Sequence, residues 1–139
     1  MSDSKTISAY DQFESDNTLE AGGVWVPIGT MQFKIARAGG ENEAFVKAVT
    51  KRFKPFQAAI AADAMPKALA TEIVIAVFCE TVLKDWKDVF DRKGEEILFT
   101  VEAAKGLLTD LPNLFAALQA EAQKVANFRK ANLEAASGN

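Results

Sequence analysis

The chain has 139 residues, 16 of them basic and 19 acidic, which gives a formal net charge of −3. This weakly acidic balance does not favour nucleic acid or an anionic membrane surface as a partner. Histidine is absent, which removes the commonest general base and the commonest zinc ligand, while 49% hydrophobic residues are enough for a packed core. We therefore expect a protein that is not an enzyme and needs no cofactor or metal.

The distribution of apolar residues and cysteine indicates a cytoplasmic protein. The longest uninterrupted apolar run, Ile73–Cys79, is far shorter than the roughly 20 residues that cross a membrane. The N-terminus is polar and acidic and lacks the apolar segment of a signal peptide. Cys79 is the only cysteine, so no intrachain disulfide can form, which is typical of a reducing compartment.

The first 22 residues are rich in Ser, Asp, Asn and Thr. Such a composition rarely buries enough apolar surface to offset the entropy lost on ordering. We expect a flexible N-terminal tail over residues 1–22 and a single helical domain over residues 23–139. Tyr10 and Phe13 are the aromatic residues of this tail, and they could dock on the domain or on a partner.

Residues 24–37 predict a β-hairpin. Strand-forming residues open the segment, and apolar residues alternate with polar ones over residues 31–35. Gly29 lies between the two runs, at the position where a type II′ turn takes glycine. Pro27 cannot donate a hydrogen bond to a neighbouring strand, so the first strand is expected at an edge of its sheet.

A helix is expected after the hairpin, with Asn42 as its N-cap. Pro55 lies inside this helical pattern and should break or kink the helix near residue 54, because the residue before proline avoids helical geometry. A second helical piece is expected over residues 56–62.

A long central helix is predicted from about residue 67 to residue 90. Pro66 suits its first turn, and Val82, Trp86 and Val89 follow the spacing i, i+4, i+7. This register favours a core position for Trp86 over a role as an exposed anchor for a partner.

Two further helices complete the predicted fold. Gly94 suits the turn after the central helix, and Thr100 is a good N-cap for a helix from residue 101 to about residue 109. Asp110 is expected to cap the last helix, with Pro112 in its first turn. The predicted fold class is mainly α (α+β): an N-terminal β-hairpin followed by a bundle of about four to five helices.

Two sets of charged residues, one acidic and one basic, could form a binding site. The acidic set has carboxylates at intervals of three residues and could hold a divalent cation. Calcium, however, needs six or more oxygens in a loop, so solvated helix charges are the better interpretation. Lysines one helical turn apart could contact nucleic acid, but the chain is acidic overall, which favours a solvated face. The groups are Asp85, Asp88 and Asp91, and Lys47, Lys51 and Lys54.

The last helix carries an apolar stripe that could pack on its own domain or contact a partner. The residues predicted to bind a partner are Leu114, Phe115, Leu118, Val125 and Phe128. Because the last turns carry fewer large apolar residues, deletion beyond about residue 127 is expected to leave the fold intact and to weaken partner binding or self-association.

Several motifs resemble those of phage tail assembly chaperones. An acidic turn with glycine separates a Leu-x-x-Trp motif from an aromatic-Thr helix start, and a Leu-Pro break follows a Leu-rich helix. The first strand carries tryptophan, and a basic residue precedes an Asn with an aromatic residue three positions later. The matching residues are Trp25, Arg37, Asn42, Phe45, Leu83, Trp86, Gly94, Phe99, Thr100, Leu111 and Pro112.

This resemblance implies a protein of the host cytoplasm that binds the tape-measure protein of a long-tailed phage. It would keep that protein soluble until the tail tube polymerises, and it would be absent from the mature virion. The tail tube protein and further copies of the chain are additional implied partners, whereas nucleic acid, membranes and cofactors are not. The alternative is another phage or bacterial helical interaction module, such as a head–tail accessory protein or an adaptor, without catalytic activity.

Overall fold

The β-hairpin forms as its sequence predicts. The computed structural model describes residues 8–14 and 16–128. Strands β1 (Val24–Ile28) and β2 (Met31–Ile35) are antiparallel and are joined by a two-residue loop. Of the two loop residues only Gly29 has a positive φ, 61°, as a type II′ turn requires. β1 lies at an edge of the sheet, which confirms the prediction from Pro27.

A third strand replaces the second half of the predicted central helix. Helix α5 (Lys67–Thr81) is followed by β3 (Leu83–Lys87), which pairs antiparallel with β2 and sets Trp86 opposite Phe33. The prediction of one helix from residue 67 to residue 90 is therefore wrong beyond residue 81. A β-bulge in this pairing permits burial at intervals that also fit a helix, and the open edge of β2 provides the hydrogen bonds that stabilise the strand.

Charged side chains line β3, the other edge of the sheet. Lys84, Asp85 and Lys87 are exposed, and the carboxylate of Asp85 accepts a hydrogen bond from the backbone N–H of Trp86 at 2.8 Å. The Lys87 ammonium lies 4.2 Å from the centre of a ring of Trp25 on β1. Charges on an edge strand oppose pairing with a strand of another chain.

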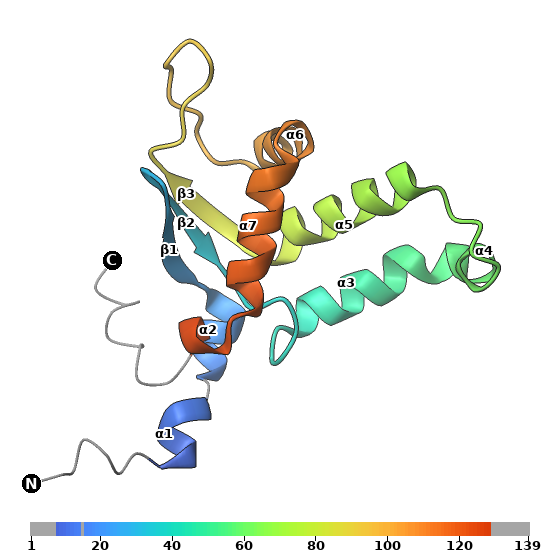
Figure 1. Ribbon diagram of the computed structural model, residues 1–139, viewed down its shortest axis with the longest axis horizontal. Helices are drawn as coiled ribbons and strands as arrows, with labels where there is room; N and C mark the ends of the chain where they lie inside the picture. Colours follow the sequence, from blue (N-terminus) through green and yellow to red (C-terminus); the bar gives the residue numbers. More distant parts are fainter. Residues whose placement is uncertain (1–7, 15, 129–139) are drawn as a thin grey trace, which may run out of the picture.

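An arm of antiparallel helices projects from the sheet (Figure 1). It consists of α3 (Glu43–Phe53), a 3₁₀ turn η2 (Lys54–Phe56), α4 (Gln57–Ala61) and the returning α5. The interruption at η2 confirms the break predicted from Pro55. Helix α3 lies along α5, and none of its residues is fully buried.

Asn42 holds the base of this arm to the sheet. Its side-chain amide donates to the backbone carbonyls of Arg37, after β2, and of Thr81, at the end of α5, at 2.9 and 3.0 Å. Its side-chain oxygen accepts the N–H of Phe45, which confirms its prediction as the N-cap of α3. One buried side chain thus joins three elements.

Helices α6 (Val101–Asp110) and α7 (Pro112–Gln123) follow, and η3 (Val125–Phe128) is a 3₁₀ helix. The Thr100 hydroxyl accepts the N–H of Ala103 at 3.0 Å, which confirms this cap. Asp110 is instead the last residue of α6, so its predicted capping of the last helix is wrong. The predicted fold class, mainly helical α+β, is confirmed: among the described residues a small antiparallel sheet is combined with five α-helices, α3 to α7, that follow the hairpin.

The predicted flexible tail contains two short helices, α1 (Ala9–Phe13) and α2 (Asn17–Gly22). Asp16 caps α2, and Leu19 and Glu20 are buried. The prediction is therefore wrong for residues 16–22, because a single apolar side chain and a paired carboxylate attach this polar segment to the body. The predicted tail residues 1–7 and 15 lie outside the described residues.

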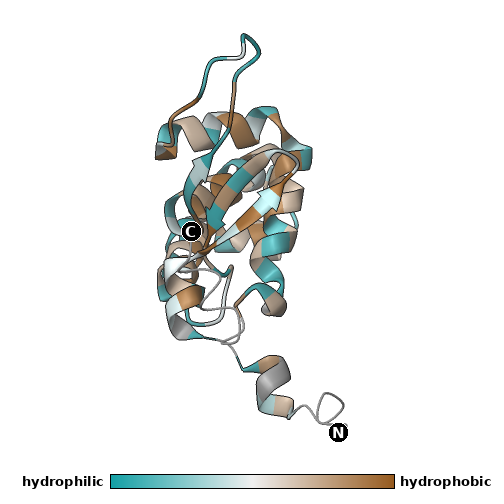
Figure 2. Cartoon of the chain, turned by 90° about the vertical axis from the view of Figure 1, so that its left-hand side faces the viewer, coloured by the Kyte–Doolittle hydropathy of each residue, from teal (hydrophilic) through white to brown (hydrophobic). Residues whose placement is uncertain are grey.

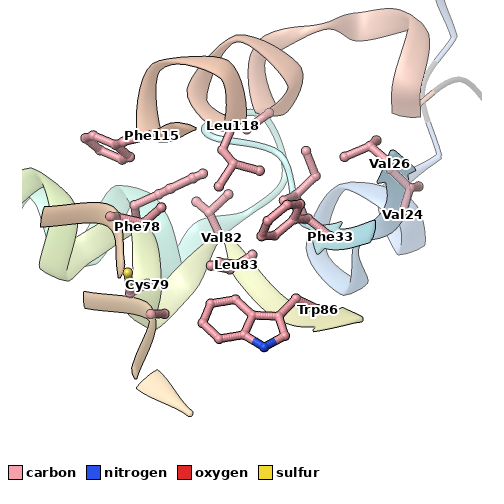
Figure 3. Packing of buried hydrophobic residues seen from close by; sticks show 14 of the residues in the cluster. Val24, Val26, Phe33, Phe78, Cys79, Val82, Leu83, Trp86, Phe115 and Leu118 are labelled. Carbon is pink, nitrogen blue, oxygen red and sulfur yellow. The ribbon is translucent and has the colours of Figure 1, made fainter. Parts of the chain in front are cut away.

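The core lies between the sheet and the helices α5 and α7 (Figure 3). Phe78 of α5 packs on Phe115 of α7 with ring centres 5.3 Å apart, and Phe33 meets Trp86 edge to face at 6.2 Å. Leu118 is fully buried among them. Trp86 is thus a core residue, as its spacing favoured, and its indole N–H donates to the carbonyl of residue 97 at 2.7 Å.

Candidate functional site

An open groove of about 740 Å³ lies between the N-terminal part of α5 and the corner that joins α6 to α7. Its size suits either a small molecule or several side chains of a partner helix. Half of its sixteen lining residues are aliphatic or aromatic, and these come from all three helices. The apolar residues are Ala68, Leu69, Ile73, Ile75, Ala76, Leu108, Pro112 and Phe115.

The sequence of α5 explains why this groove is apolar. Apolar residues occur on every side of the helix, and a helix of this kind is stable only when protein covers it all round. Helices α3 and α6 cover two sides, and the end of α5 packs against β3. In the N-terminal half, however, Leu69, Ala70 and Val74 are only half-buried, so this part of the helix remains incompletely covered.

Gly106 leaves one wall of the groove without a side chain. It lies inside α6, and no heavy atom stands within 4 Å of the position that a Cβ atom would take. Glycine in a helix interior is less favourable than alanine by about 1 kcal/mol. The α6 backbone is consequently open to close approach by another segment at this point.

An ion cluster beside the groove joins helices α3, α5 and α6. The Glu80 carboxylate of α5 accepts a hydrogen bond from Arg52 of α3 at 2.6 Å and lies 3.2 Å from the ammonium of Lys105 on α6. Burial raises the pKa of Glu80, but the hydrogen bonds from Lys105 and Arg52 outweigh it and hold the pKa below its ordinary value. Arg52 and Lys105 also line the groove, so its two cations are both bound to Glu80.

Acidic residues form part of the rim of the groove. Glu72 of α5 and Asp110 of α6 line the groove and are exposed, and neither forms an ion pair with another residue of the described part of the chain. Glu102 contributes a third carboxylate, which lies 3.8 Å from Lys105. The rim therefore has a negative potential above an apolar floor.

The residues predicted to bind a partner lie mostly in this chain's own core. Phe115, Leu118 and Phe128 are buried, and Leu114 is half-buried. A partner could reach the buried side chains only if α7 and η3 moved away. Phe115 nevertheless borders the groove, so one member of the set lies at the candidate site. Val125 lies in η3, and its side chain is outside what the structure describes.

The loop over residues 88–99 projects beyond β3 and also exposes apolar side chains. Its tip is hydrophilic, and the apolar residues lie on its two arms (Figure 2). The Asp91 carboxylate accepts the backbone N–H groups of Lys93 and Glu95 at 2.8 and 3.0 Å, which fixes the turn. Phe90 and Leu98, 55% and 76% exposed, lie on its two arms. Asp91 thus serves the turn that the sequence indicated around Gly94.

The other candidate groups lie in unremarkable surroundings. Within residues 8–14 and 16–128, no cluster of three or more acidic or cysteine side chains is placed to hold a metal ion. The three lysines of α3 and η2 are exposed. Cys79 is buried, and burial raises the pKa of its thiol to about 11. No helix in the described part of the chain is long and apolar enough to span a membrane.

Sequence reasoning missed the groove, because its walls come from segments about 30 residues apart. One signal was available in Gly106, a glycine inside an otherwise regular helical pattern, which often marks a close approach. Glu72 and Asp110 carry no signal of their own, since exposed carboxylates are common on helices.

The model of a family described as YdaY prophage protein matches residues 40–139. This range begins at the base of the arm and includes every residue that lines the groove. No curated protein and no solved structure shows a significant match to the chain.

Proposed function

The chain belongs to the YdaY prophage protein family, and from this premise we propose that it is a tail assembly chaperone, which binds the tape-measure protein and keeps it soluble until the tail tube polymerises. The groove between α5, α6 and α7 is the observation that carries this proposal. The likeness of Trp86, Gly94 and Thr100 to chaperone motifs supports it.

The physical case begins with the partner. A tape-measure protein is long and helical, and before the tube surrounds it, its apolar faces would self-associate. An apolar groove on a small, charged protein is suited to covering such a face. The proposed role requires binding and release and no catalytic group.

The binding must also be reversible. Many copies along one extended partner would give high total avidity from moderate affinity at each site. A groove with an apolar floor and a charged rim fits this requirement, because the floor contributes affinity while the rim charges contribute mainly specificity. Removal of each copy by the growing tube would then break only one moderate contact.

Co-expression tests the proposal. The partner is the longest helix-rich reading frame of the same prophage, produced with and without this chain, and the two soluble fractions are compared. We expect the chain to raise the soluble yield of the partner and to co-purify with it through an affinity tag. Equal aggregation in both cultures, with no complex recovered, would remove the chaperone proposal.

The exposed loop over residues 88–99 favours one rival function. Phe90 and Leu98 offer a second apolar contact, and an adaptor needs two contacts to join two particle proteins. The two functions differ in the finished particle. A chaperone of the host cytoplasm is absent from purified virions, whereas a head–tail adaptor is retained, so mass spectrometry of virions distinguishes them.

A further inference from the structure

We propose that the groove binds an amphipathic helix of the partner, which crosses α6 at Gly106 and places a lysine or arginine beside Glu72 and Asp110. The identity of the partner as a tape-measure protein rests on the proposed function. The chemistry of the bound segment rests on the groove alone.

The shape of the groove favours a helix. Its floor is the half-covered N-terminal part of α5, and one wall is the bare backbone at Gly106. Small residues let two helix backbones approach closely, and side chains of a crossing helix can then fill the space beside them. A crossing helix would also cover Leu69, which the chain itself leaves half-buried.

The charge around the groove determines which charge a bound segment should carry. Arg52 and Lys105 pair with the carboxylates of Glu80 and Glu102, whereas Glu72 and Asp110 form no ion pair within the described residues. An acidic segment would meet these two carboxylates and be repelled, and a basic one would be attracted. The occupant is therefore an apolar helix with a cationic residue near its contact face.

A synthetic probe tests the site directly. The probe is a fluorescein-labelled amphipathic peptide of about 15 residues, with leucine and alanine on one face and lysines near one end. A twin peptide has glutamate in place of lysine. Fluorescence anisotropy with the full chain should show that the lysine peptide binds about tenfold or more tightly than its twin. Equal affinities, or no binding of the lysine peptide, would overturn the proposal.

Gly106 provides a matched pair of variants. Gly106→Leu should weaken binding of the lysine peptide at least about tenfold because it fills the groove, while Gly106→Ala should change it by no more than about threefold. Both variants should melt at or above the wild-type temperature, since each replaces a helix-interior glycine. Unchanged binding by a folded Gly106→Leu variant would overturn the proposal.

Charge reversal gives a test that does not depend on filling the groove. The double variant Glu72→Lys, Asp110→Lys should reverse the preference between the two peptides, and Glu95→Lys, on the loop over residues 88–99, should not. If the preference stays the same in the double variant, the charge assignment is wrong. If Gly106→Leu instead converts a dimer of this chain to a monomer by light scattering, the occupant is a second copy and the proposal fails.

The outcomes separate this inference from the proposed function. If the tape-measure protein co-purifies equally with wild type and with Gly106→Leu, the groove is not its site and the chaperone proposal stands. If the lysine peptide binds as described but no tape-measure protein is kept soluble, the groove inference stands and the chaperone proposal fails.

Discussion

Glu20 and Arg37 form an ion pair of 2.8 Å in which the carboxylate is almost fully buried, at 1% exposure. The second carboxylate oxygen accepts the backbone N–H of Glu41 at 2.7 Å. One side chain of α2 thus binds the segment that leads from β2 into the arm. A buried carboxylate is tolerated only with such partners.

Replacement of Glu20 should therefore destabilise the fold. Glu20→Ala should lower the free energy of unfolding by about 3 kcal/mol or more, because Arg37 and the N–H of Glu41 lose their acceptor. Urea denaturation measures the change. The exposed Glu95→Ala variant is the control and should stay within about 0.5 kcal/mol of wild type. A loss of similar size in both variants would contradict the structural role of Glu20.

Trp86 gives a second stability test. Trp86→Ala should cost about 3–5 kcal/mol, because it leaves a cavity against Phe33 and Phe99. Trp86→Phe keeps an aromatic ring but removes the hydrogen bond to the carbonyl of Ile97, and should cost about 1–3 kcal/mol. Chemical denaturation ranks the two variants. A Trp86→Ala protein with unchanged stability but weakened partner binding would show instead that Trp86 faces a partner.

Phe128 tests the expectation that the chain end is dispensable. It is fully buried, and its backbone carbonyl accepts the N–H of Asp16 at 2.8 Å, so the end of the described chain holds α2 in place. Phe128→Ala should cost about 3–5 kcal/mol, and deletion from residue 128 onward should do at least as much. Gln123→Ala, at an exposed position, is the control. Circular dichroism during thermal melting would refute this if Phe128→Ala melted like the control.

The Glu80 cluster predicts loss of stability on acidification. In the folded state the pKa of the Glu80 carboxyl lies below its ordinary value of 4.5, so the unfolded state binds more protons at mildly acidic pH. The ionised Glu80 carboxylate therefore stabilises the folded state fully above the ordinary pKa. This contribution is lost as the pH falls through the pKa of the folded state. Stability measured from about pH 5 downward should decline less steeply in Glu80→Gln than in wild type. Parallel declines would show that Glu80 does not contribute.

Cys79 should be inert until the protein unfolds. With the pKa raised to about 11 by burial, roughly one thiol in a thousand is ionised near pH 8. A chromogenic disulfide reagent should therefore react with Cys79 at the rate of global or local opening, and rapidly in guanidinium chloride. Fast reaction with the native protein would contradict the burial of the thiol.

Local sequence determined those elements whose evidence lies within a few residues. The alternation over residues 31–35 and Gly29 predicted the hairpin and its turn, and Asn42 and Thr100 predicted helix starts. Pro55 predicted the interruption between α3 and α4. In each case one side chain or one backbone preference acts on its immediate neighbours. The outcome therefore does not depend on distant parts of the chain.

Only the tertiary structure decided the features that join distant segments. Residues 83–87 fit a helix by spacing, but the free edge of β2 makes them a strand. Glu20 lies in a polar segment and is buried because Arg37 and the Glu41 N–H meet it there. The groove beside Gly106 exists only where α5, α6 and α7 converge. Hydrogen bonds, ion pairs and packing contacts between residues far apart in sequence outweigh the local preference for a secondary structure. A sequence window cannot predict them, because the two partners meet only when the chain has folded.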